Sequence, residues 1–212
     1  MMKRIVFSFA VTLCAGWTLA DDFGLNPAAG TDTVYFRSSA KLEFIEGKTT
    51  DIQGGFRFNP PNPRGELSGV LRVDLRTLKT GIETRDGHMR DRHLHTKDFP
   101  YAYFELLSAS GFPDTIVVDS AYTIDVEGFF YIHGVKRRIA ARLTASSRPP
   151  QSGSTAMKLD ARFALRLDDF KIPRPKALFL KLAEVIEVEA VFTTLSTASI
   201  PVITLPDWPE LH

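Results

Sequence analysis

The stretch Tyr122–Ile132, YTIDVEGFFYI, followed by His133-Gly134 and by Val135–Ala145, VKRRIAARLTA, decides the fold. In both runs apolar and polar residues alternate, which is the pattern of a β-strand with one buried face. A glycine between two such runs is typical of a hairpin, because glycine tolerates the backbone conformations of a tight turn. We therefore expect two antiparallel strands joined at His133-Gly134.

The same alternation continues on both sides of this hairpin. It is regular over residues 67–75 and 157–167, and shorter strand-like runs occupy 33–39, 42–47, 52–59, 101–110 and 185–194. About eight strands thus follow one another without long helices between them, which favours an antiparallel meander. Closing such a sheet into a barrel removes its edges, and the interior is then either packed or holds one small ligand.

The first twenty residues have the pattern of a secretory signal peptide. Lys3 and Arg4 precede the apolar stretch Ile5–Ala15, and small residues lead to a cleavage site after Ala20. The apolar run is too short to span a bilayer of roughly 30 Å, so we expect cleavage and no membrane anchor. Cleavage would also remove Cys14, the single cysteine, and with it any disulfide or thiolate ligand. The expected location is the periplasm or the exterior.

Composition fits a single globular domain. The chain has 212 residues, 44% of them hydrophobic and 24% charged. Loss of the signal peptide would change the formal net charge from +1 to about −1, so no basic field favours nucleic acid as a partner. We divide the chain into a signal peptide (1–20), a leader (21–30), the barrel domain (31–194) and a C-terminal tail (195–212).

Residues 81–104 break the strand pattern. Charged residues, histidines and turn residues gather there, and Ile82, Met89 and Leu94 have only loosely helical spacing, with Gly87 between them. A short and irregular helix is the most that this pattern predicts. Because the segment lies between strands, we expect it to form a flap at one end of the barrel.

The flap segment also contains four candidate metal ligands, His88, Asp91, His93 and His95. Their nitrogen and oxygen donors are of the kind that zinc binds, but the spacing matches no specific zinc motif. No single secondary structure places all four on one face. The other interpretation is that they hold the segment against the strand ends through hydrogen bonds and ion pairs. If the four residues did bind a metal ion, the protein would be a metal-assisted hydrolase, and this is the alternative function.

Other catalytic chemistry has little support in the sequence. No GxSxG elbow exposes a serine, and cleavage would leave no cysteine nucleophile. We therefore expect neither enzymatic activity nor a cofactor.

Aromatic composition favours a large apolar interior. Sixteen Phe against two Trp and five Tyr give many bulky side chains without polar groups. A filled core and a ligand cavity fit this composition equally well. The residues expected to line such a cavity are Phe36, Phe44, Phe58, Leu71, Val73, Phe104, Ile124, Phe130, Phe163, Leu165, Val188 and Phe192.

These residues together resemble the YceI-like family of exported, lipocalin-like barrels. The matching pieces are GGFRFNP (54–60), TLKTG (77–81) ahead of RDRHL (90–94), FPYAYF (99–104), IHGVK (132–136) and RLDDFKI (166–172). The resemblance extends from about Thr31 to Thr194. It implies an eight-stranded antiparallel barrel whose apolar cavity binds polyisoprenoids or similar long-chain amphiphiles without catalysis.

The resemblance also assigns positions near the barrel mouth. Arg90, Asp91, His93 and Leu94 match the family signature there, which implies a role in closure. The chain departs from the family pattern by a shorter segment between His95 and Pro100 and by its tail, which contains Trp208.

Three functions follow from the sequence. The leading hypothesis is an exported carrier of a long-chain isoprenoid or fatty amphiphile, and the second is the hydrolase described above. A third is a structural partner module that uses the tail, for which truncation after Thr194 should abolish complex formation.

Overall fold

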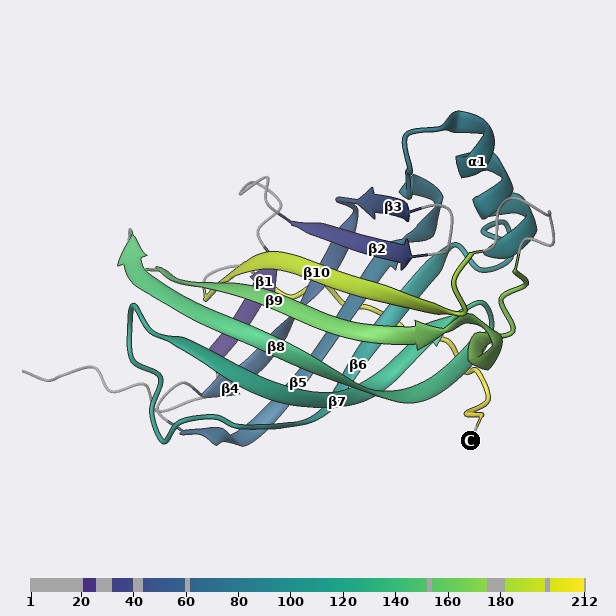
Figure 1. The fold of residues 1–212 in the computed structure, drawn as a ribbon. Helices are drawn as coiled ribbons and strands as arrows, with labels where there is room; N and C mark the ends of the chain where they lie inside the picture. The colour runs from purple at the N-terminus through teal and green to yellow at the C-terminus, as the bar shows by residue number, and fades with distance from the viewer. Residues whose placement is uncertain are drawn as a thin grey trace, which may run out of the picture.

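The computed structural model describes residues 21–25, 32–39, 44–59, 62–151, 154–174, 182–196 and 199–211. The expected signal peptide lies outside the described residues. These ranges form a single ten-stranded sheet with a small helical segment at one end (Figure 1). The strands are β1 Asp21–Leu25, β2 Thr33–Ser39, β3 Phe44–Thr49, β4 Ile52–Asn59, β5 Asn62–Asp74, β6 Tyr101–Ser110, β7 Ala121–Ile132, β8 Val135–Gln151, β9 Ser154–Arg166 and β10 Val185–Leu195.

Within the described ranges, four short helical turns lie between or beside these strands. They are η2 Leu75–Thr77, α1 Glu83–His88, η3 Met89–His93 and η4 Leu167–Phe170. The helix α1 and the π-helical turn η3 follow each other directly and form the helical part of the segment that stands over one end of the sheet (Figure 1). The expected short, irregular helix is therefore confirmed.

Eight of the strands close into an antiparallel barrel. Their order is β1-β4-β5-β6-β7-β8-β9-β10, and β10 pairs back with β1, where Gly24 lies opposite Leu195 and Leu25 opposite Thr194. This pairing joins the two ends of the eight-stranded sheet. The expected eight-stranded antiparallel barrel is confirmed.

Strand β10 has two partners along the edge that faces β1. Residues 187–191 pair with β2, and the last two residues pair with β1, so β2 and β3 branch from the barrel as a separate pair. Between the two partners the Thr193 N–H donates to Asp32 Oδ1 at 2.9 Å. The carboxylate thus satisfies a backbone donor at the branch point, and burial raises the pKa of Asp32 because desolvation disfavours the charged form.

Strand β1 lies in a segment that the sequence suggested was only a leader. Its Phe23 is 1% exposed and faces the interior, while Asp22 forms an ion pair with Arg57 outside, at 2.6 Å. The strand has five residues and only two large inward side chains, Phe23 and Leu25, too few for a clear pattern of alternation. Its position is fixed by β4 and β10, which are distant in sequence.

The hairpin at His133-Gly134 forms as expected. Strands β7 and β8 pair without interruption from Ala121 opposite Ser146 to Ile132 opposite Val135. His133 and Gly134 have φ values of 54° and 75°, the combination required by a type I′ turn. The twist of this turn matches that of the strands, which explains how so short a connection supports so long a hairpin.

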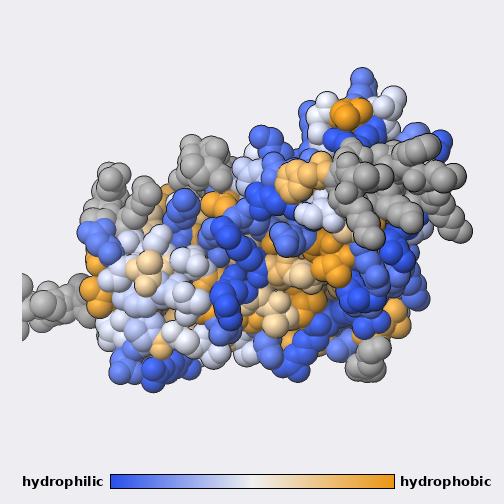
Figure 2. Space-filling view, in the orientation of Figure 1, coloured by the Kyte–Doolittle hydropathy of each residue, from blue (hydrophilic) through white to orange (hydrophobic). Residues whose placement is uncertain are grey.

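The interior is divided between the two ends of the barrel. We call the end that carries the flap the mouth; its buried cluster includes Leu75, Ile132, Val135 and Phe170. The opposite, far end is occupied by a second buried cluster, whose large members are Phe23, Phe58, Ile124, Met157 and Phe192. Polar and charged side chains cover much of the outside of the strands, with apolar side chains visible between them (Figure 2).

Candidate functional site

The barrel contains a cavity of about 620 Å³. Every strand contributes inward side chains to its wall, and nearly all of them are apolar. Apart from Tyr103 and Thr194, the polar lining comes from the flap and its root, through Thr80, Thr84, Arg85, His88 and His93. The site is therefore apolar along the barrel and polar at the mouth, which suits a molecule with a long apolar part and one polar end.

Eleven of the twelve residues expected to line a cavity lie in its wall. They are Phe36, Phe58, Leu71, Val73, Phe104, Ile124, Phe130, Phe163, Leu165, Val188 and Phe192.

Phe44 is the exception. Its side chain is 62% exposed, and its neighbour Ile45, at 7%, faces the interior instead. A shift of one residue in a strand exchanges the two faces, and β3 takes its register from β2 and from a bridge between Lys48 and Lys79. The assignment of Phe44 was therefore wrong by one position.

Three cavity phenylalanines lie against glycines of neighbouring strands. In each pair a Cβ added to the glycine would overlap the phenyl ring. The pairs are Phe36 with Gly47, Phe56 with Gly69 and Phe104 with Gly128. Each phenyl ring lies over its glycine, in the space that the side chain of a larger residue would fill. The ring therefore lies against the wall and not in the centre of the barrel. Glycine in these strands thus helps to keep the interior hollow.

The flap is anchored by a compact polar group at its start. The buried carboxylate of Asp86 accepts hydrogen bonds from the backbone N–H of Thr80, at 2.8 Å, and from the Thr80 hydroxyl. Arg85 Nε donates to the same hydroxyl at 2.8 Å. Met89 and Leu94 pack against the mouth cluster. The flap therefore presents apolar side chains to the cavity and fixes its own backbone through Thr80.

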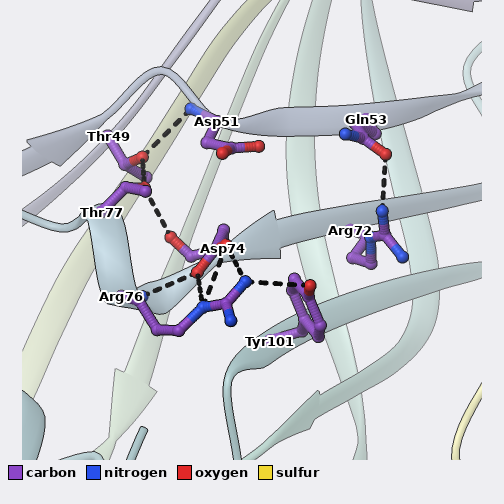
Figure 3. Close-up of polar contacts among 8 residues, drawn as sticks. All are labelled: Thr49, Asp51, Gln53, Arg72, Asp74, Arg76, Thr77 and Tyr101. Carbon is purple, nitrogen blue, oxygen red and sulfur yellow. Dashed lines mark hydrogen bonds and ion pairs between the residues drawn. The ribbon is translucent and has the colours of Figure 1, made fainter.

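The root of the flap is tied to the barrel by the contacts shown in Figure 3. Asp74 accepts from the backbone N–H of Arg76 at 2.9 Å and pairs with its guanidinium at 2.5 Å. Arg76 also donates to the Tyr101 hydroxyl at 3.0 Å. Thr77 joins Thr49 through their hydroxyl oxygens, 2.6 Å apart. The hydrogen bond from Arg76 is the main cause that lowers the pKa of Asp74.

Histidine side chains hold the other end of the flap. His93 Nδ1 lies 2.7 Å from the Pro173 carbonyl oxygen, and His95 Nδ1 lies 2.9 Å from His133 Nε2. His133 Nδ1 in turn lies 3.1 Å from the Phe170 carbonyl oxygen. A carbonyl oxygen only accepts, so in this arrangement His133 Nδ1 carries the proton and Nε2 accepts from His95. Burial lowers the pKa of His133, and the neighbouring His95 adds to this effect.

The four candidate metal ligands do not converge on one point. Among the described residues, no three His, Cys, Asp or Glu side chains are placed to hold a metal ion together. His93 and His95 are directed to Pro173 and His133 instead, and Asp91 is exposed. Within the family signature, His93 and Leu94 line the cavity, whereas Arg90 and Asp91 lie outside its wall.

The tail packs on the outside of the barrel beside the hairpin turn. The ring of Trp208 lies 5.6 Å from that of Phe99 and 6.3 Å from that of Tyr131, between centroids. The Leu211 N–H donates to the Lys136 carbonyl oxygen at 3.1 Å. Tyr131 is consequently 2% exposed although it lies outside the cavity wall, and its pKa is raised by burial and by its hydrogen bond to Glu105.

A family model for the YceI-like domain matches residues 25–194. The chain belongs to the YceI-like family. The flap and strands β2 to β9 lie within this YceI-like domain, as does β10 up to residue 194, whereas most of β1 and the tail from residue 195 lie outside the matched range. No curated protein gives a significant match to the chain.

Solved structures share the fold of this YceI-like chain. BcnA from Burkholderia cenocepacia aligns with a TM-score of 0.63 at 13% identity, covering 80% of this chain and 98% of that one. A polyisoprenoid binding domain from Saccharophagus degradans aligns at 0.62 and 18%, covering 82% and 98%. The Campylobacter jejuni YCEI protein aligns at 0.61 and 15%, covering 92% and 98%. At these identities the likeness shows the fold alone.

Proposed function

We propose that this chain is an exported carrier that sequesters a long-chain isoprenoid or another amphiphile in its barrel. The observation that carries the proposal is the apolar cavity of about 620 Å³, lined from every strand. Burying a methylene group there stabilises a complex by about 0.8 kcal/mol, so a chain of a dozen carbons offsets the cost of its own ordering. The polyisoprenoid binding domain with the same fold supports this ligand class.

The distribution of polar groups gives the ligand a direction. Thr84, Arg85, His88 and His93 line the cavity only at the flap, and the far end is apolar. An amphiphile would therefore place its chain along the barrel and its polar end beneath the flap. Arg90, Asp91, His93 and Leu94 would then act in closure, with Leu94 and His93 facing the ligand.

Binding without catalysis is the activity that we infer. Among the candidate metal ligands, His93 and His95 are directed to separate partners, and no three such side chains in the described part of the chain lie together. The chain also belongs to a family whose structural relatives include a named binding domain. Export is inferred from residues 1–20, with the periplasm or the exterior as the location. Within the described part of the chain, no helix is long and apolar enough to cross a bilayer.

Native mass spectrometry of the purified protein tests the proposal. We expect an added mass that organic extraction removes, and displacement of a fluorescent fatty or isoprenoid probe by the extracted lipid. Ala141→Phe, which fills the cavity, should weaken probe binding at least tenfold, whereas Ala140→Phe on the exposed face should not. A ligand-free mass together with no probe binding would contradict the carrier function.

A further inference from the structure

The far end of the cavity is closed by the loop between β6 and β7. Phe112 and Ile116 of this loop pack against the far cluster. Arg64 donates to the Phe112 carbonyl oxygen at 3.1 Å, and the Ser147 hydroxyl donates to the Val117 carbonyl oxygen at 2.9 Å. A ligand that enters at the mouth therefore meets a fixed end at the other side.

Four phenylalanines line the far part of the cavity beside this loop, and Phe112 of the loop lines it with them. Phe23 stacks on Phe58 with ring centroids 4.7 Å apart, and Phe56 stacks on Phe192 at 6.0 Å. They come from β1, β4 and β10, the strands that meet at the closing seam of the barrel. Phe23 and Phe192 are each 1% exposed, so these rings have little freedom to withdraw from a ligand.

We propose that Phe23, Phe58 and Phe192, together with Phe112 of the loop, form the floor of the cavity and limit the bound chain to about 20 carbons. This inference rests on the proposed lipid-carrier function. A methylene group takes up about as much space as a water molecule, roughly 30 Å³, so the cavity of about 620 Å³ holds about 20 of them. The ligand class is therefore a single chain of four isoprene units or its straight-chain equivalent.

The floor makes affinity depend on chain length in a specific way. Each carbon that fits inside the barrel should raise the affinity about fourfold, because it leaves water for an apolar wall. A carbon beyond the limit stays at the mouth in water and adds nothing. Affinity should therefore rise to about 20 carbons and then stay constant.

The experiment measures dissociation constants of the full chain for straight-chain alcohols and polyprenols of increasing length, by displacement of the fluorescent probe. Native mass spectrometry of mixtures of two lengths checks the order of affinities without the probe. The expected result is a plateau beginning near 20 carbons.

Two substitutions should move this plateau in opposite directions. Phe58→Ala removes part of the floor, and truncation of a large buried side chain opens roughly 150 Å³, enough for about five more carbons. Gly69→Ala adds a methyl group where the ring of Phe56 lies, so the ring must turn into the cavity and the plateau should move to shorter chains. Phe44→Ala, at an exposed position, is the control and should leave the plateau unchanged.

The outcomes separate this inference from the function on which it rests. If no chain of any length binds, the carrier function fails. If chains bind but affinity continues to rise well beyond 20 carbons, or if both floor variants keep the wild-type plateau, the floor is overturned while the carrier function stands. Gly69→Ala and the wild-type series still decide the matter if Phe58→Ala does not fold, which circular dichroism will show.

Discussion

His133 has two roles, one through its backbone and one through its side chain. Its positive φ builds the hairpin turn, and its ring joins His95 of the flap to the Phe170 carbonyl oxygen. The ring contacts His95, Phe99 and the Phe170 backbone. The lowered pKa of His133 means that the folded protein favours the neutral ring.

Replacement His133→Asn should separate these two roles. Asn-Gly is a preferred type I′ turn, so the hairpin should form normally. Since the folded pKa of His133 is lower than the unfolded one, its contribution to stability is present above about pH 6.5 and is lost as the pH falls. Urea unfolding from pH 7.5 to pH 5 should show a weaker pH dependence in the variant. An unchanged dependence would contradict the assignment.

Sequence reasoning identified His133 as a turn residue but not as a partner of the flap. The turn followed from its place before Gly134 between two alternating runs. Its bond to His95 joins residues 38 positions apart, and nothing local in the sequence specifies that contact. The chemistry of His93 and His95 is evident in the sequence, but only the structure shows that their rings are directed to Pro173 and His133.

The root of the flap depends on Asp74. Its carboxylate caps the turn η2 and pairs with Arg76, and both contacts hold the start of the flap beside β4 (Figure 3). Because the folded pKa is lowered, this contribution is present above about pH 4 and lost as the pH falls.

Asp74→Ala should lower the free energy of unfolding by about 1 to 2 kcal/mol at neutral pH, as expected for loss of a side-chain cap. It should also speed release of a bound probe, since the flap is held less firmly. Asp51→Ala is the matched control, because Asp51 contributes its backbone to the same group of contacts. Equal stabilities and release rates for the two variants would refute this role.

Most strands were predictable from their alternation, whereas β1 and the inward face of β3 were not. Strands β5, β7, β8 and β9 each have enough residues for period two to stand out. β1 has five residues and depends on β4 and β10 for its place. β3 was recognised as a strand, but the choice between Phe44 and Ile45 as the inward residue depends on its pairing with β2.

The C-terminal tail packs against the outside of the barrel. The ring of Trp208 contacts those of Tyr131 and Phe99. Phe99, near the end of the flap segment, also contacts the ring of His133 in the hairpin turn. The tail therefore supports the flap from outside, in addition to any role as a partner surface.

Trp208→Ala should remove two aromatic contacts and lower stability by about 1 to 3 kcal/mol. Tyr131 should then ionise nearer its ordinary pH in an ultraviolet titration, because less of it is buried. Val202→Ala, at a position 98% exposed, should change neither quantity. A Trp208 variant with unaltered stability and tyrosine titration would show that the tail is not packed as described.

The seam between β1 and β10 gives the folding reaction an order. It joins the earliest and the latest of the described strands, and a contact so distant along the chain is slow to form because of the entropy of loop closure. Until it forms, β4 and the last residues of β10, beyond the part that pairs with β2, each present a bare edge to other chains. The pairing of β1 with β10 thus closes the ligand cavity and, in the same step, removes the strand edges through which the incomplete barrel could aggregate.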